Sequence, residues 1–201
     1  MNHFTKVTLS TGELAMANDK NIILTKRAVI ETAAALFNSL ISSINEHFKD
    51  SLEQIEMIAS STPKITKGEN YKNFPYVILD YPARFEKENI FAFRTMFWWG
   101  NFISITLHIS GKYKKHFEKN IFVALQQNEN FFLCVAENEW QHHFEEDNYK
   151  KVSEINKAEI NTFLQKDFIK VALKYELHHW NMMQSILPEG YKALKELLIN
   201  N

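Results

Sequence analysis

The clearest chemical pattern in the sequence is a pair of alternating runs, residues 90–99 and 102–110, that meet at Gly100-Asn101. Such a pair of residues is typical of a tight β-hairpin turn, and a two-residue turn would pair Trp99 with Phe102. In that register, one face of the hairpin alternates aromatic rings with hydroxyl groups and an imidazole: Phe91, Phe93, Thr95, Phe97, Trp99, Phe102, Ser104, Thr106, His108 and Ser110. A few polar groups between aromatic walls are what a pocket for a small molecule needs. The alternative is an outer sheet face covered by the N-terminal segment or by a second subunit.

Arg94 stands out because the other face of the expected hairpin is otherwise apolar. An unpaired guanidinium would be costly there, so Arg94 must reach an anion or solvent. Asp80 is the favoured partner, and a bound carboxylate or phosphate is the alternative. Arg84 could form a second anion-binding group, although an exposed loop charge is the favoured interpretation. The candidate ligand-binding residues are therefore Phe93, Thr95, Phe97, Trp99, Thr106, His108 and Arg94.

Histidines are the remaining candidates for acid/base or metal chemistry. His142 and His143 fall in a predicted strand and would point to opposite faces, so at most one of them could join a given site. Glu176 and His179 have the E-x-x-H spacing found in di-metal helix bundles, but such sites need more helices and more ligands. Interaction with the end of a helix is the favoured role of His178 and His179.

A composite site of His108, His142 and Glu145 on adjacent strands is conceivable, yet no spacing rule requires it. The sequence therefore assigns no metal, and the cofactor stays unknown. A lysine group with His116 could bind an anion, although solvated helix faces usually carry such residues: Lys112, Lys114, Lys115 and Lys119. Cys134 lies within the apolar run FFLCVA and is expected to be buried and unreactive.

Composition is that of an ordinary globular protein, with 201 residues, 45% hydrophobic residues and a net charge of -1. A single domain over residues 1–201 is expected. The balanced charge provides no overall field for nucleic acid. One cysteine, no signal-peptide pattern and no run of roughly 18 uninterrupted apolar residues favour a cytoplasmic protein without a membrane span.

Periodicity predicts the elements that position these groups. Helices are expected over residues 25–48, 51–60, 113–125 and 156–175, and from Pro188 onward. Residues 64–74 have the composition of a polar loop, and the first 20 residues that of an arm or an edge strand near residues 6–9. Strands are expected at about residues 76–81, 90–99, 102–110, 131–136 and 140–145. This order predicts an α+β fold, with an antiparallel sheet of about four or five strands packed with N-terminal and C-terminal helices.

Three functions are compatible with these observations. The first is a cytoplasmic domain that binds a small aromatic or acidic molecule over the hairpin face. The second is an enzyme that uses His108 or His142 as acid/base, with or without a metal ion, on an anionic substrate held by Arg94 or Arg84. The third is a homodimer that buries the aromatic face and the segment WNMMQSIL, residues 180–187, against a second copy.

Overall fold

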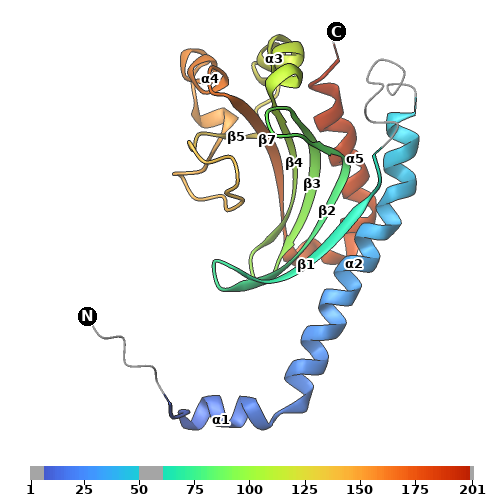
Figure 1. Ribbon diagram of the computed structural model, residues 1–201, viewed down its shortest axis with the longest axis vertical. Coiled ribbons are helices and arrows are strands. Elements are labelled where there is room, and N and C mark those ends of the chain that lie inside the picture. Colours follow the sequence, from blue (N-terminus) through green and yellow to red (C-terminus); the bar gives the residue numbers. More distant parts are fainter. Residues whose placement is uncertain (1–6, 50–60, 200–201) are drawn as a thin grey trace.

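The computed structural model describes residues 7–49 and 61–199. The helices are α1 Thr11–Asn18, α2 Lys20–Phe48, α3 Gly111–Leu125, α4 Lys157–Leu164 and α5 Met183–Glu196, with 3-10 turns at Val152–Glu154 and Leu177–Met182. The strands are β1 Lys64–Tyr71, β2 Phe74–Phe85, β3 Ile90–Trp98, β4 Phe102–Ser110, β5 Phe132–Cys134, β6 Tyr149–Lys151 and β7 Phe168–Glu176. They form one antiparallel sheet in the order β1-β2-β3-β4-β7-β5-β6 (Figure 1). The expected α+β class is confirmed, but the described residues form seven strands instead of four or five. The helix expected over residues 51–60 lies outside the described residues.

The hairpin β3–β4 lies at the centre of the sheet and is covered on both faces. All residues of β4 are buried, and so are all residues of β3 except the partly exposed Arg94. Helices α2 and α5 lie against one face (Figure 1), and an irregular segment between β5 and β6 lies over the other. Burial on both sides explains why the two strands are rich in large apolar side chains throughout.

The hairpin is confirmed, but its predicted register is wrong by one residue. Trp98, and not Trp99, pairs with Phe102, and Gly100 takes a φ of 72° within the turn. Because directly paired residues share a face, this shift moves every side chain of β3 to the opposite side relative to β4. Three phenylalanines of β3, Phe91, Phe93 and Phe97, therefore share the helix-covered face with four aliphatic residues of β4: Ile103, Ile105, Leu107 and Ile109.

Helix α2 confirms the most regular pattern in the sequence. Its buried residues recur every three or four positions and pack on the sheet: Ala33, Phe37, Leu40, Ile44 and Phe48. The helix begins earlier than Thr25, at Lys20, because the Asp19 side chain accepts a hydrogen bond from the Asn21 N–H at 2.8 Å. Its first turns project away from the sheet (Figure 1), which leaves Ile22, Ile23 and Leu24 exposed.

The helix predicted over residues 156–175 is wrong in its second half. Helix α4 ends at Leu164, and Phe168 begins β7, which pairs with β4 along nine residues from Phe168 to Glu176. From Ile169 and Val171 onward, apolar residues recur at every second position, which is the period of a strand. Together with the apolar residues of α4 they also match a helical stripe, which is why the sequence predicts one long helix. Pairing with β4 selects the strand, because an unpaired β4 edge would leave buried backbone groups without hydrogen bonds.

Other boundaries also differ from the prediction. Residues 64–71 form the edge strand β1 and not a loop, since an edge strand can remain polar. Residues 140–145 are not a strand, and β5 instead pairs with β6 on one side and with β7 on the other. Residues 7–9 form no strand, and Ser10 instead begins α1 with a capping box. Helix α5 starts before Pro188 and contains it.

One described helix, α2, is long and apolar enough to cross a membrane by length and composition alone. A core helix of a soluble protein meets the same criterion, and the second half of α2 packs on the sheet. The cytoplasmic location therefore remains a prediction.

Candidate functional site

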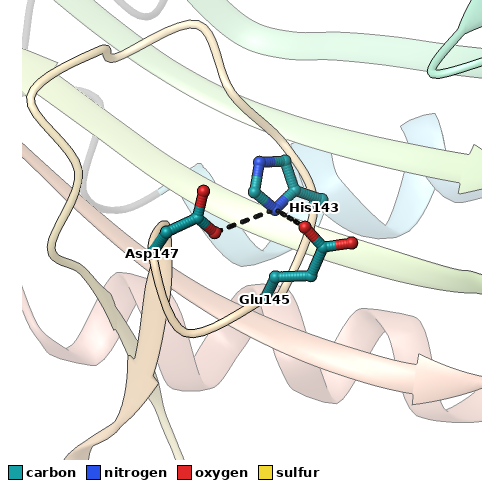
Figure 2. A group of neighbouring side chains, drawn as sticks. All are labelled: His143, Glu145 and Asp147. Carbon is teal, nitrogen blue, oxygen red and sulfur yellow. Dashed lines mark ion pairs between the residues drawn. The ribbon is translucent and has the colours of Figure 1, made fainter.

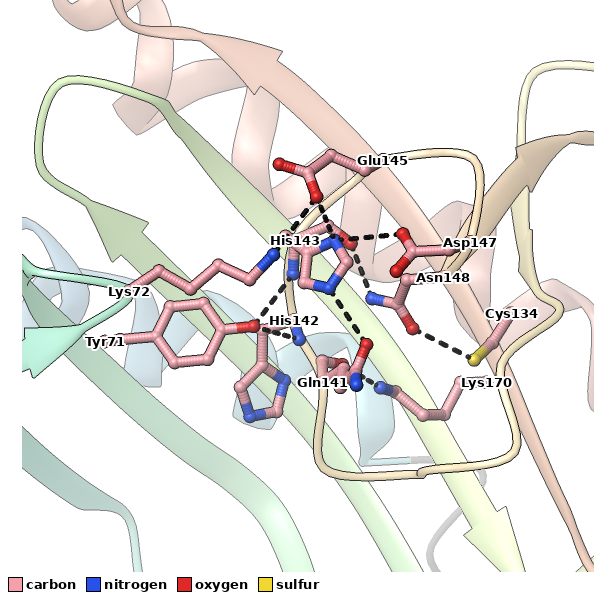
Figure 3. Close-up of polar contacts among 10 residues, drawn as sticks. All are labelled: Tyr71, Lys72, Cys134, Gln141, His142, His143, Glu145, Asp147, Asn148 and Lys170. Atoms are coloured by element: carbon pink, nitrogen blue, oxygen red, sulfur yellow. Dashed lines mark hydrogen bonds and ion pairs between the residues drawn. The ribbon is translucent and has the colours of Figure 1, made fainter. Parts of the chain in front are cut away.

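The sheet face opposite α2 and α5 carries a buried set of charged and hydroxyl side chains, which we call the polar face. Register places its members side by side on β2, β3, β4 and β7: Asp80, Arg94, Thr106, His108 and Lys170. Residues 135–148, the capping loop, cover this face (Figure 3). The loop is irregular because its polar side chains bond to its own backbone; for example, Asn148 donates to the His143 carbonyl at 2.5 Å.

Arg94 forms the ion pair that its apolar surroundings require. Its Nε and Nη2 donate to the two carboxylate oxygens of Asp80 at 2.7 and 3.0 Å. The Asp80 partner was predicted, and the structure confirms it. Arg94 Nη1 also lies 3.1 Å from His142 Nε2, which must accept because a guanidinium has no acceptor. Burial, the largest cause, holds the pKa of His142 well below 6.5, so this imidazole is neutral.

His108 forms a second buried polar contact, with Glu139 of the capping loop. Its Nε2 lies 2.9 Å from Glu139 Oε2, and its ring is buried. Burial lowers the pKa of His108 below 6.5, although Glu139 acts in the opposite direction. The hydrogen bond from His108 lowers the pKa of Glu139. A neutral imidazole therefore donates to a carboxylate that is ionised at neutral pH.

Two lysines attach the capping loop to the sheet. The buried Lys170 donates to the carbonyls of Glu139 at 2.9 Å and Gln141 at 2.5 Å, and burial lowers its pKa to about 8. Lys166 donates to the carbonyls of Val135 and Ala136 at 2.6 and 3.0 Å. Backbone carbonyls of the loop thus take the place of water around both amines.

His142 and His143 diverge as expected, although they lie in the loop and not in a strand. Their backbone N–H groups both donate to the Tyr71 hydroxyl, at 2.7 and 3.1 Å, while His143 Nε2 lies 2.9 Å from Gln141 Oε1 (Figure 3). The composite site of His108, His142 and Glu145 is not assembled, because each residue has different polar partners.

The structure also shows where Cys134 and the E-x-x-H pair of Glu176 and His179 lie. Cys134 is buried, as expected, and burial raises the pKa of its thiol. The E-x-x-H interpretation is wrong, because Glu176 ends β7 while His178 and His179 lie in the following 3-10 turn.

A cleft of about 410 Å³ opens beside the polar face, at the junction of β4 and α3. Gly111 makes this junction possible: its φ is +57°, and a Cβ there would meet the Glu88 carbonyl at 2.1 Å. The cleft is lined by Lys87, Glu88, Ser110, Gly111, Lys114, Lys115, Glu139, Gln165, Lys166, Asp167 and Phe168. Two members of the lysine group identified in the sequence, Lys114 and Lys115, therefore contribute to it.

The structure divides the predicted ligand-binding residues between two faces. Phe93, Thr95 and Phe97 lie in the core under the helices, where the Thr95 hydroxyl is 2.6 Å from the Tyr191 hydroxyl. Trp99 lies at the turn and lines a separate groove beside the start of α2. Arg94, Thr106 and His108 share the polar face. The aromatic, hydroxyl-lined surface expected from the sequence is therefore not formed.

Sequence reasoning missed Lys170 and Glu139, which complete the polar face. Lys170 lies within residues 156–175, where the periodicity predicts a helix, although its alternation with Ile169 and Val171 is a strand signal. Glu139 lies between the strands expected at residues 131–136 and 140–145, where no local pattern connects it with His108.

Comparison with known proteins identifies no relative: no family model, no curated protein and no solved structure matches the chain.

Acidification is expected to destabilise the protein through His108. Because its pKa is lower in the folded chain than the ordinary 6.5, the unfolded chain takes up a proton first as the pH falls. The His108 contribution is therefore complete above about pH 6.5 and is lost as the pH falls toward the folded pKa. Thermal unfolding of the wild type and of His108→Gln, followed from about pH 7.5 to about pH 5, should show a smaller pH-dependent loss in the variant. Equal slopes would contradict this role.

Proposed function

We propose that the protein is a cytoplasmic small-molecule-binding domain whose ligand is a small anion held in the lysine-lined cleft. One observation carries the proposal. Lys87 and Lys115 both border the cleft, and neither has a carboxylate partner within residues 7–49 and 61–199. The other two lysines of the cleft are already engaged, Lys114 with Glu118 and Lys166 with Glu137. Glu88, Glu139 and Asp167 line the same cleft, so the two free ammonium groups lie beside carboxylates and favour a ligand that has an anionic group together with an amine or hydroxyl.

The start of α3 supports the same charge preference. The helix begins at Gly111 in the wall of the cleft, so the positive end of its dipole faces the same space as the lysines. Asn89 Oδ1 accepts the Lys112 N–H at 2.9 Å, so part of this first turn is already satisfied within the chain. The lysines therefore supply the main attraction, and the helix end adds to it.

Glu139 gives the cleft a second recognition group. Its carboxylate borders the cavity while His108 holds it from behind. A fixed carboxylate accepts hydrogen bonds, so it favours a ligand that has an amine or hydroxyl in addition to its anionic group. The lysines together with Glu139 are therefore expected to bind an amino acid phosphate, which carries an amine, more tightly than inorganic phosphate, which does not.

Calorimetric titration with two probes, inorganic phosphate and O-phosphoserine, tests the proposal. Lys87→Gln combined with Lys115→Gln should weaken binding of both probes by roughly tenfold, about 1.4 kcal/mol. Glu139→Gln should weaken only O-phosphoserine. Lys119→Gln is the matched control, because Lys119 lies one turn beyond Lys115 on α3 and outside the cleft lining. No saturable binding of either probe, or an equal loss in the control, would exclude the cleft.

An enzyme is the second candidate, and one contact favours it. The His108–Glu139 pair presents a carboxylate at the edge of the cleft, where Glu139 could act as a general base with His108 as its positioning residue. In that case, Glu139→Gln should abolish conversion of a bound ligand while binding persists. The aromatic interface of a homodimer has less support, because α2 and α5 of the same chain cover Phe91, Phe93 and Phe97 of β3.

A further inference from the structure

The capping loop brings three potential metal ligands together at alternate positions, His143, Glu145 and Asp147. His143 Nδ1 lies 3.5 Å from a Glu145 oxygen and 3.7 Å from an Asp147 oxygen. One ligand atom from each residue lies within 4.8 Å of those from the other two. Figure 2 shows the imidazole nitrogen directed between the two carboxylates.

Among the described residues, no group forms a hydrogen bond with this nitrogen of His143. The side chain is only 2% exposed, yet Nδ1 has no hydrogen-bond partner within residues 7–49 and 61–199. The other ring nitrogen, Nε2, lies 2.9 Å from Gln141 Oε1, which accepts a hydrogen bond and therefore assigns the ring proton to Nε2. In the neutral ring, the lone pair of Nδ1 then faces two carboxylates. Such an arrangement is repulsive unless a cation lies between the three groups.

The distances also fit a bound ion better than a direct ion pair. Charge-assisted N–H···O bonds are about 2.7–2.9 Å long, which is shorter than either contact. Ligand atoms about 2.1 Å from a tetrahedral zinc ion are separated by about 3.4 Å, close to the observed 3.5 and 3.7 Å.

We propose that His143 Nδ1, Glu145 and Asp147 form a site for a divalent transition-metal ion of the zinc type, with a fourth position open to water or a ligand. This inference does not depend on the anion cleft. Gln141 holds the imidazole through Nε2, as outer partners of metal-bound histidines do. The Tyr71 hydroxyl and the Asn148 amide hold the backbone around His143, so the position of this one ligand is set before an ion binds (Figure 3).

Lys72 competes with the metal in this arrangement. Its Nζ lies 3.1 Å from Glu145 Oε2 and is the main cause that lowers the pKa of that carboxyl. Lys72 lies in the turn between β1 and β2, and 43% of its side chain is exposed, so it can move into solvent when an ion binds. Removing this positive charge should therefore strengthen metal binding.

The test is a titration of the full, chelator-treated chain with zinc chloride alone, using a chromophoric chelator as competitor. Glu145→Gln and Asp147→Asn should each weaken zinc binding at least tenfold, because each removes a charged ligand that is already exposed and contributes little to folding. Glu146→Gln is the matched control, because this exposed carboxylate lies between the two ligands but outside the set. It should bind zinc as the wild type does.

Lys72→Met should have the opposite effect and raise the affinity for zinc severalfold. Zinc bound with equal affinity by Glu145→Gln and Asp147→Asn would place the ion elsewhere, for example at the adjacent rings of His178 and His179, and would overturn the proposal. Absence of zinc binding by the wild type would also overturn it. Because these variants leave Lys87 and Lys115 in place, loss of the metal site and loss of the anion cleft are separate outcomes.

Discussion

Replacing Arg94 by methionine is expected to lower the free energy of unfolding by about 3–5 kcal/mol. The substitution leaves the Asp80 carboxylate, 12% exposed, without its cation, and removes the donor to His142 Nε2. An uncompensated charge in such surroundings costs more than the pair contributes when both partners are present. Urea-induced unfolding at neutral pH measures the change.

The adjacent surface pair provides the control. Arg84 bonds Glu86 at 2.7 Å, but the two side chains are 44% and 35% exposed, against 16% and 12% for Arg94 and Asp80. Arg84→Met should therefore change the free energy of unfolding by at most about 1 kcal/mol. Adding Asp80→Leu to Arg94→Met should recover much of the loss, since no buried charge then remains unpaired. Equal effects of the two arginine substitutions would show that burial of the Arg94–Asp80 pair has no energetic consequence.

Replacing Phe93 by alanine is expected to destabilise the protein by about 3–5 kcal/mol and to leave ligand binding to the folded protein unchanged. Phe93 is 0% exposed, stacks on Tyr191 with ring centroids 5.7 Å apart, and meets Phe48 edge-on at 5.0 Å. The cavity left by the ring lies between β3, α2 and α5, where neighbouring side chains are held by several elements. Thermal and urea unfolding measure the loss.

Phe74→Ala is the matched comparison for this substitution. Phe74 is 45% exposed at the start of β2, so its removal should cost about 1 kcal/mol or less. Binding of inorganic phosphate, measured on folded Phe93→Ala at low temperature, separates a core role from a ligand-contact role. A small stability loss together with lost phosphate binding would favour the original assignment of Phe93 to a ligand surface.

Sequence patterns predicted correctly those features of the structure that depend on a few consecutive residues. The core residues of α2 follow from spacing alone, because only one face of a helix can pack on a sheet. The Arg94–Asp80 pair follows from the cost of an unpaired charge among apolar neighbours. The α+β class follows from the order of the helical and alternating segments.

Such sequence patterns could not determine the register of the β3–β4 hairpin. Glycine tolerates positive φ in turns of either two or three residues, so Gly100 does not distinguish them. The three-residue solution places Phe93, Thr95 and Phe97 under α2 and α5, and it separates them from Thr106 and His108. A difference of one residue in the turn thus decided which side chains share a face.

The sequence by itself determined the fold class, the principal helix and the need for an Arg94 partner, because each depends on short-range periodicity or on the desolvation of a single charge. Only the tertiary structure decided the candidate sites. Lys170 reaches the capping loop because β7 pairs with β4 instead of continuing α4, and Glu139 meets His108 because that loop folds back over the sheet. These contacts join segments far apart in the chain, and their partners come within reach only when the sheet is assembled, so no local pattern records them.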